Sequence, residues 1–474
     1  MSSTSQVRGR IDALLDENSF IEIGSRVTAR NTDFNQNAEQ TPSDGVVTGY
    51  GVIDGNLVYV YAQDASVLGG SIGEMHARKI TRLYELAMKT GAPVIALIDS
   101  AGLRLQEGVD ALQAFGGIYL SQVNASGVVP QITAVFGNCG GGLSVLSALS
   151  DFTLMENKAR LFLNSPNALD GNYTEKCNTA SADFQSGDAG TVDFVGDEGE
   201  ILAQIRQLVS FLPSNNEADD AQIECTDDLN RVCDGLDGAA ADPAVFFTMI
   251  SDNGEFFEAK KAYAKDMVTG FIRLNGQTVG AVGNRTALFD ENGEKKETFD
   301  AVLSAKGAEK AADFVKFCDA FDIPVLSVTD VNGFKACMCN EKRLPRALAS
   351  LTAAFAGATV PKINLVAGKA YGSAAVIMNS QALGADITIA WPDAQIGTMA
   401  ADAAAKILCA GDAAGQAQCA KAYAEAQTDV TGAARRGYVD EIVEPADTRK
   451  YIIGALEMLY TKRDDRPAKK HSAV

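Results

Sequence analysis

The feature that most constrains this chain is an internal repeat. Thr48-Gly49 and Asp54-Gly55 recur 221 residues later as Thr269-Gly270 and Asn275-Gly276. Further landmarks recur 231 residues later, and one insertion explains the change of offset: Ala92-Pro93-Val94 with Ile323-Pro324-Val325, Asp99 with Asp330, Gly102 with Gly333, Val129-Pro130 with Val360-Pro361, and Gly137 with Gly368. The repeat predicts two similar halves, each ending in a glycine-rich turn, that contribute one pocket each to a composite site.

The spacing of apolar residues predicts the same elements in both halves. Turn residues flanked by alternating apolar positions predict hairpins, and helical spacing and short apolar runs predict helices and buried parallel strands. In the first half we expect a hairpin at 46–63, helices at 75–90 and 143–149, and strands at 93–98 and 131–136. In the second half we expect a hairpin at 267–282, helices at 308–321 and 344–358, and strands at 324–329 and 361–367. This order predicts an α/β fold of two tandem β-β-α superhelix domains.

An acidic segment separates the two halves. The chain of 474 residues suits two cores of about 200 to 240 residues each. Residues 213–234 carry seven acidic side chains and one arginine, which predicts a solvated linker. We place the boundary at 217–235 and the domains at 1–222 and 223–474.

The charge of the chain excludes some classes of partner. A formal net charge of −20 argues against nucleic acid or an anionic membrane as a general partner, because phosphates repel such a surface. Residues 1–20 contain no apolar signal segment, and the uncharged stretch 347–361 is too short to span a bilayer. These observations predict a cytoplasmic protein.

Cysteine and histidine usage gives no indication of a metal site. The nine cysteines are scattered and are not spaced as a disulfide framework, so we expect reduced thiols. Cys337 and Cys339 form a C-x-C pair, but no second pair accompanies them, and His76 and His471 are the only histidines. We therefore expect no bound metal.

Each glycine-rich turn, 137–142 and 368–374, follows a predicted strand and opens a helix. Glycine permits close backbone approach, and the first N–H groups of a helix have no partner within it. Such N–H groups can hold a carbonyl oxygen as it becomes an enolate or oxyanion. At a single turn, ordinary packing of helix on strand is the alternative, but the same turn in both repeats favours the oxyanion site. Neither turn is a phosphate-binding P-loop, since no Gly-Lys-Ser/Thr follows.

The chain offers no pairing of a nucleophile with a histidine. His76 lies on a predicted amphipathic helix, where we expect a structural role, and His471 lies in the tail. This favours a reaction in which substrate carbonyls are polarised and a cofactor accepts or donates the proton. We expect Asp99 and Asp330 to anchor loops at the ends of equivalent strands. Four basic residues could bind ligand phosphates or be surface charges: Arg78, Lys79, Arg104 and Lys158.

Several longer strings carry a family resemblance over residues 6–471. They are 44–51 (DGVVTGYG), 69–74 (GGSIGE), 106–109 (QEGV), 125–131 (ASGVVPQ), 252–256 (DNGEF), 369–372 (KAYG), 390–392 (AWP) and 436–441 (RGYVDE). At these residues the chain resembles the carboxyltransferase components of biotin-dependent acyl-CoA carboxylases and decarboxylases. That family includes the propionyl-CoA carboxylase beta subunit, the methylmalonyl-CoA decarboxylase alpha subunit and the large transcarboxylase subunit.

The resemblance implies a fold, an assembly and a chemistry. It implies two tandem crotonase-like (ClpP/crotonase) domains in a homohexamer, with acyl-CoA held by domain 1–222 and biotin held by domain 223–474 of another subunit. The implied reaction moves CO2 between carboxybiotin and a short-chain acyl-CoA through an enolate, and the biotin nitrogen exchanges the proton. The chain carries no ATP-grasp domain and no Met-Lys-Met attachment site. A separate biotin carboxyl carrier protein, and either a biotin carboxylase or membrane decarboxylase subunits, are therefore the implied partners.

The resemblance also assigns roles to residues of this chain. Gly141 and Gly142 would form a first oxyanion hole, and Gly372, Ser373 and Ala374 a second. Four residues are the candidates for contacts with bound biotin or acyl-CoA: Arg78, Gly140, Tyr371 and Val376. An apolar residue at Val376 is expected to accept a short or medium acyl group.

Departures from the family pattern leave alternatives open. Gly140 and Ser373 replace an alanine and a glycine of the family, 335–343 replaces a family loop, and the stretch 167–195 lacks a family Gly-Gly-x-x-x-His motif. The acyl group and the direction of CO2 transfer are therefore left open, including a decarboxylase linked to a sodium pump. A scaffold subunit with reduced catalysis and a crotonase-type hydratase or isomerase, which would need paired acidic residues, are the further alternatives.

Overall fold

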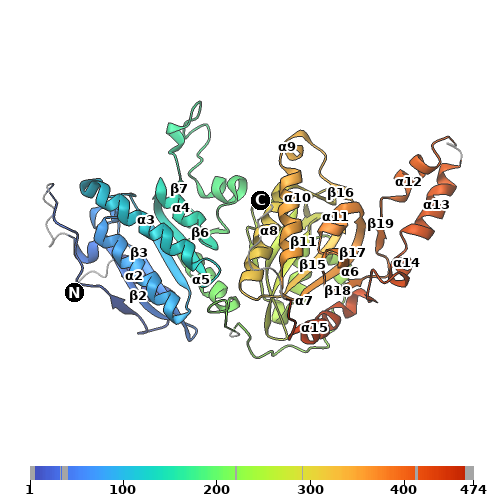
Figure 1. Ribbon diagram of the computed structural model, residues 1–474, viewed down its shortest axis with the longest axis horizontal. Coiled ribbons are helices and arrows are strands. Elements are labelled where there is room, and N and C mark those ends of the chain that lie inside the picture. Colours follow the sequence, from blue (N-terminus) through green and yellow to red (C-terminus); the bar gives the residue numbers. More distant parts are fainter. Residues whose placement is uncertain are drawn as a thin grey trace. The chain divides into compact units, whose positions relative to one another are not determined.

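The computed structural model describes residues 6–32, 34, 41–218, 221–290, 292–411 and 415–464, so that His471 lies outside the described residues. The chain forms two compact units, Met1–Ala221 and Gln222–Val474, each with its own sheet and core (Figure 1). None of the helices in these described ranges is long and apolar enough to cross a membrane.

The first unit is built on an eight-stranded sheet with the order β1-β2-β3-β4-β5-β6-β8, and β7 pairs with an extension of β5. Its strands are β1 (Ile21–Ile23), β2 (Val46–Ile53), β3 (Asn56–Gln63), β4 (Val94–Ser100), β5 (Gln131–Gly140), β6 (Phe152–Glu156), β7 (Arg160–Phe162) and β8 (Phe194–Gly196). The hairpin β2–β3 is antiparallel, and the pairs β3–β4, β4–β5 and β5–β6 are parallel.

Helices cover both faces of this sheet. They are α1 (Gln6–Leu14), α2 (Glu74–Thr90), α3 (Gly108–Ala125), α4 (Gly142–Ala148) and α5 (Glu198–Phe211). The buried face of α2, including Ile80, Leu83 and Tyr84, packs with Phe115 and Ile118 of α3 against the sheet. α1 and α5 pack together and against strands of the same sheet. Burial of this apolar surface is the main source of the unit's stability.

The second unit repeats the sheet strand for strand, in the order β20-β18-β17-β15-β11-β10-β9, with β19 paired to an extension of β17. Its strands are β9 (Phe256–Ala259), β10 (Met267–Leu274), β11 (Gln277–Asn284), β15 (Val325–Val331), β17 (Lys362–Tyr371), β18 (Ile387–Ala390), β19 (Gln395–Gly397) and β20 (Glu441–Ile442). Two further small sheets pair β12 (Ala287–Phe289) with β13 (Lys295–Thr298) and β14 (Val302–Leu303) with β16 (Gly333–Phe334).

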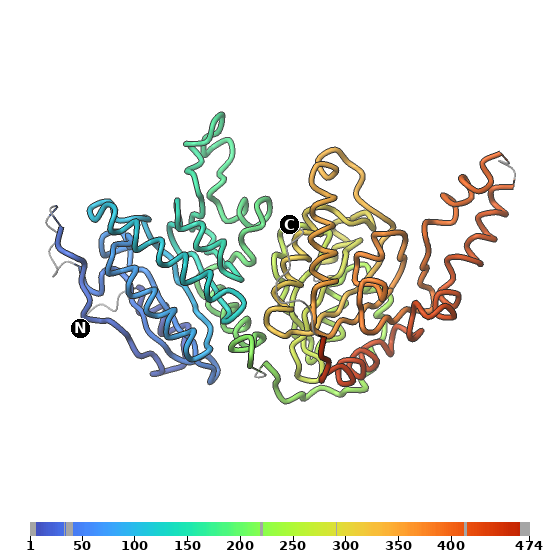
Figure 2. Tube along the Cα trace, viewed as in Figure 1, coloured from blue at the N-terminus to red at the C-terminus, as the bar shows by residue number. Residues whose placement is uncertain are grey.

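Ten helices of the second unit are described. They are α6 (Leu236–Ala239), α7 (Pro243–Ile250), α8 (Ala305–Ala320), α9 (Met338–Glu341), α10 (Leu344–Gly357), α11 (Gly372–Ile377), α12 (Ala401–Leu408), α13 (Gln416–Gln427), α14 (Val430–Arg435) and α15 (Thr448–Leu459). α8 packs with α10 and against the hairpin strands, and residues of α7 and α15 share a core cluster with the sheet. α12 and α13 form a helical pair that projects from this unit (Figure 2).

Both predicted hairpins, with their turns at Asp54-Gly55 and Asn275-Gly276, are confirmed. The predicted ends of two strands are wrong. β5 continues to Gly140 and β17 to Tyr371, so the glycine-rich segments begin as strand. The reason is that short strands pair with these extensions: Asn138 lies opposite Arg160 of β7, and Lys369 lies opposite Gln395 of β19.

Two further expectations need correction. The acidic segment is partly strapped to the second unit: Ile223 N–H donates to the Gly276 carbonyl at 3.0 Å, and a Cβ at Gly276 would lie 1.9 Å from the Ile223 carbonyl oxygen. Asp227 in this segment pairs with Arg231 at 3.0 Å, so it is not simply a solvated charge. The cysteines are not all reduced thiols either, because Cys409 and Cys419 form a disulfide.

Candidate active site

The same aspartate clamp precedes the turn in each unit. Asp99 at the end of β4 accepts a hydrogen bond from Asn138 N–H at 3.2 Å, and Asp330 of β15 accepts one from Lys369 N–H at 2.8 Å. A Cβ at Gly137 would lie 2.0 Å from Asp99 Oδ1, and a Cβ at Gly368 would lie 2.6 Å from Asp330 Oδ1. The repeated glycine therefore makes room for the repeated carboxylate, which confirms that these aspartates anchor loops.

The chain turns sharply at Gly141 in the first unit. The φ of Gly141 is +62°, a left-handed conformation that favours glycine. Its N–H donates to the Phe162 carbonyl at 2.9 Å. That N–H is therefore engaged within the protein, and Gly142, the first residue of α4, is the better candidate for a donor to a ligand. Gly142 is exposed, and its carbonyl accepts a hydrogen bond from Tyr119 Oη at 2.7 Å.

The second turn also has a glycine with a left-handed φ. Gly372 has a φ of +61° and opens α11. Ser373 is exposed and Ala374 is buried, so the N–H groups of this first helical turn lie at the edge of the core. A side chain at position 373 is compatible with this geometry, because the left-handed residue is Gly372 and not its neighbour.

The residues predicted to contact a ligand differ in how much of each is accessible at the surface. Gly140 lies at the end of β5, and a Cβ there would lie 2.7 Å from the Phe162 ring. Tyr371 is buried, and its hydroxyl donates to Gln395 Oε1 at 2.5 Å, so its side chain packs toward β19. Val376 is 41% exposed on α11, one turn after Gly372. Of these three, Val376 is the side chain with surface available to a ligand.

Two of the four basic residues are exposed and two are buried. Arg78 is 66% exposed and pairs with Glu74 at 2.8 Å, and Lys158 is exposed. Lys79 and Arg104 are buried. Both predicted roles, binding of a ligand phosphate and a charge on the surface, are therefore wrong for these two residues. Arg104 pairs with Asp44 at 2.5 Å and with Glu107 at 2.8 Å, and the three form a buried cluster. A buried charge is tolerated when it is paired in this way.

Each unit holds a buried lysine whose role the sequence did not reveal: Lys79 was predicted to be a phosphate ligand or a surface charge, and Lys310 was not singled out. Lys79 Nζ donates to the Ser43 carbonyl at 3.1 Å and to the Val46 carbonyl, where β2 begins. Lys310 Nζ donates to the carbonyls of Lys260, Tyr263 and Met267 at 2.9, 3.0 and 2.8 Å, where β10 begins. The two lysines are 231 residues apart, the offset of the landmark set, and this offset is the signal that could have found them.

Neither the histidine His76 nor the thiol of Cys139 can serve as a general base or nucleophile. His76 is buried, its Nδ1 lies 2.9 Å from the Asp44 carbonyl, and burial lowers its pKa to about 3, so it is a neutral structural residue as predicted. Burial raises the pKa of the Cys139 thiol to about 12, which leaves it protonated and unreactive. No group of three or more His, Cys, Asp or Glu side chains within the described ranges could hold a metal. What these turns can supply is hydrogen-bond donors for a developing negative charge.

Comparison with known proteins decides the family. A model described as the carboxyl transferase domain matches residues 4–474. The chain is 39% identical to the methylmalonyl-CoA decarboxylase subunit alpha of Veillonella parvula, covering 98% of this chain and 92% of the relative. The chain belongs to the carboxyl transferase family.

Other relatives of this carboxyltransferase agree with that assignment. It is 38% identical to the propionyl-CoA carboxylase beta chain of Roseobacter denitrificans, covering 98% of this chain and 93% of the relative. A transcarboxylase 12S crystal structure, described as a hexamer assembly with hydrolysed methylmalonyl-coenzyme A bound, matches with a TM-score of 0.91 and 37% identity, covering 98% of this chain and 91% of that one. This similarity confirms the predicted pair of crotonase-like domains.

A surface loop lies next to the first turn in the sequence of this carboxyltransferase. Residues 163–180 leave β7 directly after Phe162 and project from the first unit (Figure 2). Leu161 N–H donates to the Ala180 carbonyl at 3.0 Å and closes the base of this loop. Asn172 Nδ2 ties it internally through the carbonyls of Pro166 and Cys177. Leu163 and Tyr173 are exposed on it, which places apolar side chains on the segment that adjoins the turn.

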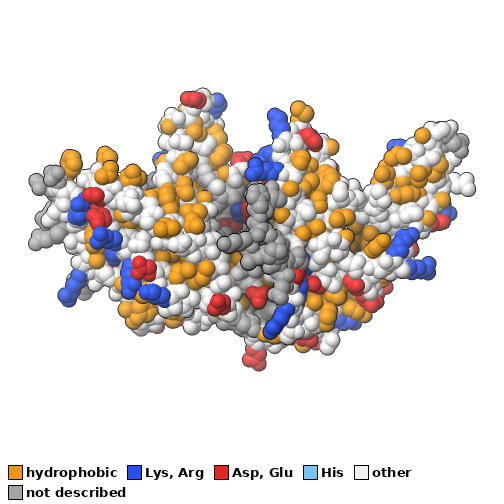
Figure 3. Space-filling model, in the orientation of Figure 1, with side chains coloured by type: hydrophobic (Ala, Val, Ile, Leu, Met, Phe, Trp, Pro, Cys, Tyr) orange, Lys and Arg blue, Asp and Glu red, His pale blue; other side chains and the backbone are white. Residues whose placement is uncertain are grey.

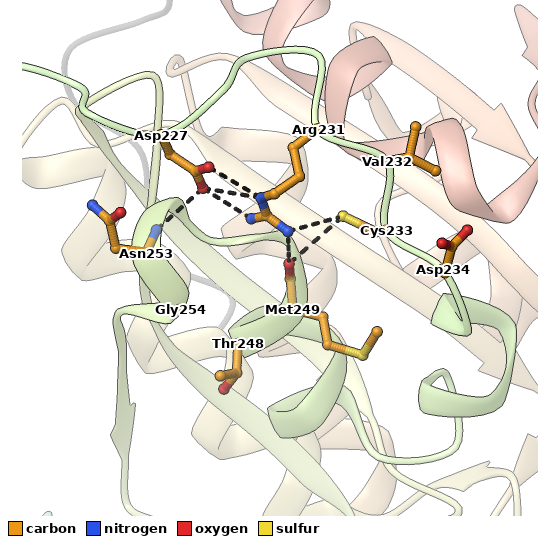
Figure 4. Close-up of a pocket in the computed structure, with 9 residues that line it drawn as sticks. All are labelled: Asp227, Arg231, Val232, Cys233, Asp234, Thr248, Met249, Asn253 and Gly254. Atoms are coloured by element: carbon orange, nitrogen blue, oxygen red, sulfur yellow. Dashed lines mark hydrogen bonds and ion pairs between the residues drawn. The ribbon is translucent and has the colours of Figure 1, made fainter.

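A cavity of about 450 Å³ in the second unit is separate from the turns (Figure 4). Arg231 on its wall donates to the Asp227 carboxylate and to the carbonyls of Met249 and Ser251 at 3.0 and 3.1 Å. Because the guanidinium is committed to these partners, this network holds the strap of residues 222–234 on its unit and does not form a ligand site.

Proposed function

We propose that this carboxyltransferase moves CO2 between carboxybiotin on a separate carrier protein and a short-chain acyl-CoA such as propionyl-CoA or methylmalonyl-CoA. The observation that carries the proposal is the repetition of one turn in both units, with matching aspartate clamps and matching left-handed glycines. Two such turns suit a reaction with two carbonyl groups, the thioester and the biotin ureido group, because each can receive backbone donors.

The division of labour follows from the repeat. In this proposal the turn at Gly141 and Gly142 serves the acyl thioester, and the turn at Gly372, Ser373 and Ala374 serves biotin. Bound biotin would supply the CO2 unit and the ring nitrogen that exchanges the proton. The protein's part is to hold both carbonyl oxygens and to stabilise the enolate oxygen through peptide N–H groups. A protein base is not needed, in keeping with the neutral His76 and the protonated Cys139.

A hydratase or isomerase is a poorer fit to this geometry. Such an enzyme needs acidic residues free to move protons at the turn. The carboxylates that adjoin the two turns, Asp99 and Asp330, accept hydrogen bonds from backbone N–H groups and hold the chain instead.

An exposed apolar stripe supports assembly with other chains. Val109, Leu112, Leu120 and Val123 lie on one face of α3 and are between 55% and 77% exposed. Figure 3 shows apolar side chains over this helix. A stripe of this kind on a surface helix marks an interaction site, so we propose a homo-oligomer, with the hexamer described for transcarboxylase 12S as its form. The further partners would be a biotin carboxyl carrier protein and either a biotin carboxylase or membrane decarboxylase subunits, which would set the direction of CO2 transfer in the cell.

A turnover assay with the purified chain tests the function. Loss of malonyl-CoA and methylmalonyl-CoA is followed with and without free biotin, on protein shown by size exclusion to be folded and oligomeric. Biotin-dependent loss of either thioester is expected. Folded protein inert toward both would contradict the proposal for these substrates and favour another acyl-CoA or a scaffold subunit.

Variants at the two turns test the residues. Gly141→Ala and Gly372→Ala each place a side chain on the left-handed residue of a turn, which should displace the N–H groups of the next residues, Gly142 and Ser373. Each should lower kcat by about 10²- to 10³-fold, the cost of losing an oxyanion donor. Gly293→Ala is the matched control, because its φ of +78° imposes the same backbone strain in a site where a Cβ meets nothing within 4 Å. Equal losses in the control and in the turn variants would assign the effect to backbone strain in general and not to the turns.

A substitution at Val376 tests the acyl preference. Val376→Asp should change the preference between the two thioesters.

A further inference from the structure

Two cysteines of the second unit bring their sulfur atoms together at the surface. Cys337 Sγ lies 3.1 Å from Cys339 Sγ. Cys339 is exposed and Cys337 is partly exposed, at the start of α9 near α10 (Figure 1). Since a disulfide bond is about 2.0 Å long, the sulfurs need to approach by only about 1 Å to become bonded.

The chain on both sides of the pair is held in place. Lys335 N–H donates to the Leu303 carbonyl at 2.9 Å, which continues the pairing of β16 with β14. Asn340 Oδ1 accepts a hydrogen bond from Ala305 N–H at 2.8 Å, at the start of α8. Arg343 binds the Glu309 carboxylate at 2.7 and 3.0 Å. These anchors hold the chain on both sides of the two thiols.

Local hydrogen bonds favour the reactive form of one thiol. Asn340 Nδ2 donates to Cys337 Sγ at 3.1 Å. This bond and the neighbouring Cys339 thiol lower the pKa of Cys337 to about 7. The thiolate is the nucleophile in thiol–disulfide exchange, and a thiol with a pKa near the ambient pH attacks fastest.

A cavity beside Cys337 gives a small reagent access to the pair. Its volume is about 400 Å³, and Asp300, Asn332, Phe334 and Lys335 are among its lining residues. This wall combines a positive charge, a negative charge, an amide and an aromatic ring. It suits a small peptide disulfide that carries both carboxylates and an amine.

We propose that Cys337 and Cys339 form a redox-active dithiol that reacts with low-molecular-weight disulfides of the glutathione class. The Cys337 thiolate attacks one sulfur of the small disulfide, forms a mixed disulfide and releases one small thiolate. Cys339 then gives its proton to water, and its sulfur attacks Cys337 Sγ, breaks the mixed disulfide, forms the Cys337–Cys339 bond and releases the second small thiolate. The two released thiolates take up the protons that the two cysteines gave to water. Two protein thiols are oxidised and one small disulfide is reduced to two thiols, so atoms and electrons balance.

The sequence around the pair provides a direct measurement. Trypsin cuts after Lys335 and Lys342 and releases residues 336–342, a peptide with both cysteines of the pair and no others. The full-length folded protein is incubated with oxidised glutathione, its remaining thiols are alkylated, and the peptide is weighed by mass spectrometry. We expect the oxidised peptide to take up no alkyl group and to be lighter than the reduced peptide by two hydrogen atoms. Dithiothreitol should restore both thiols. The peptide 407–421, with Cys409 and Cys419, reports separately on the other disulfide.

Single-cysteine variants separate the dithiol from ordinary surface thiols. Cys339→Ser should stop the reaction at a mixed disulfide on Cys337, so that this site releases one small thiol in place of two. Cys177, an exposed cysteine, is the internal control and should form only a mixed disulfide. The proposal is overturned if residues 336–342 still accept two alkyl groups after oxidation. It is equally overturned if they carry a glutathione on each sulfur and never form the internal bond.

Discussion

The two units keep the same contacts to the backbone and differ in the contacts between side chains. Lys79 and Lys310 bind the carbonyls where β2 and β10 begin, and Asp99 and Asp330 bind the N–H groups before each turn. Asp151 and Asp386 likewise accept hydrogen bonds from Gln131 N–H and Lys362 N–H, both at 2.8 Å, at the starts of β5 and β17. The backbone framework that shapes the turns is therefore common to both halves.

The surroundings of that framework have diverged. The start of α8 is capped by Ser304, whose Oγ accepts from Gly307 N–H at 3.0 Å. At the start of α2 this role falls to Glu107, which is distant in sequence and accepts from Glu74 N–H at 2.6 Å. Asp386 has a lysine partner, Lys462, at 2.8 Å, whereas burial raises the pKa of Asp151 to about 7. The two halves can therefore use different residues for one backbone contact, as at these helix starts, or different charge partners, while the backbone contact itself is retained.

Replacing the buried lysines should have the largest effect. Lys310→Met leaves three buried carbonyls without their donor and should lower the free energy of unfolding by about 3 to 5 kcal/mol. Lys79→Met leaves two carbonyls without their donor and should cost less, because its third acceptor, the Ser43 hydroxyl, keeps its hydrogen bond to Glu22. Burial lowers the pKa of Lys310 to about 7, so in the wild type the unfolded chain binds a proton that the folded protein releases between pH 7 and 10.5. Wild-type stability should rise over that window, and the rise should be smaller in Lys310→Met. Urea unfolding at pH 7 and 9 measures both effects, and equal costs at the two lysines would break the comparison.

The glycines behind the aspartate clamps should give the next largest effect. Gly137→Ala places a Cβ 2.0 Å from Asp99 Oδ1 and should cost about 2 to 3 kcal/mol, the usual penalty of overpacking. Gly368→Ala, at 2.6 Å from Asp330 Oδ1, should cost less. Thermal unfolding of each variant measures this order. Adding Asp99→Ala should relieve part of the Gly137→Ala penalty, and a purely additive double variant would contradict a direct clash.

The smallest effect is expected at the aspartates that start β5 and β17. The pKa of Asp151 is raised to about 7 from its ordinary 3.8, so the folded protein holds a proton that the unfolded chain releases between these values. Stability should therefore fall as pH rises through this window. Asp151→Asn keeps an acceptor for Gln131 N–H without the charge and should be about 1 kcal/mol more stable than the wild type at pH 8.

Asp386→Asn is the matched control for that prediction. It removes the charge partner of Lys462 and should be about 1 kcal/mol less stable at the same pH, since it leaves a largely buried ammonium unpaired. Urea unfolding at pH 5 and 8 distinguishes the two outcomes. Changes of the same sign in both variants would mean that the charge environments of the two sites do not differ as described.

The sequence predicted the repeated framework well because glycine, proline and aspartate mark positions where backbone geometry leaves little choice. The ends of β5 and β17 could not be predicted, since they depend on pairing with β7 and β19, three-residue strands with no pattern of their own. Lys79 and Arg104 were misjudged because a charge gives no sign of burial until its partners are known. The engaged N–H of Gly141 was also out of reach, because its acceptor, Phe162, belongs to one of those short strands.

The closure of the loop 163–180 at its own base has a consequence for how such enzymes can change. Leu161 and Ala180 join the two ends of the loop, and the next residue, Phe162, fixes Gly141. The contact that holds Gly141 is thus made outside the loop itself. We expect loops of different length and composition to be tolerated there while the geometry of the turn stays fixed. The loop and the turn can then change at different rates in one polypeptide.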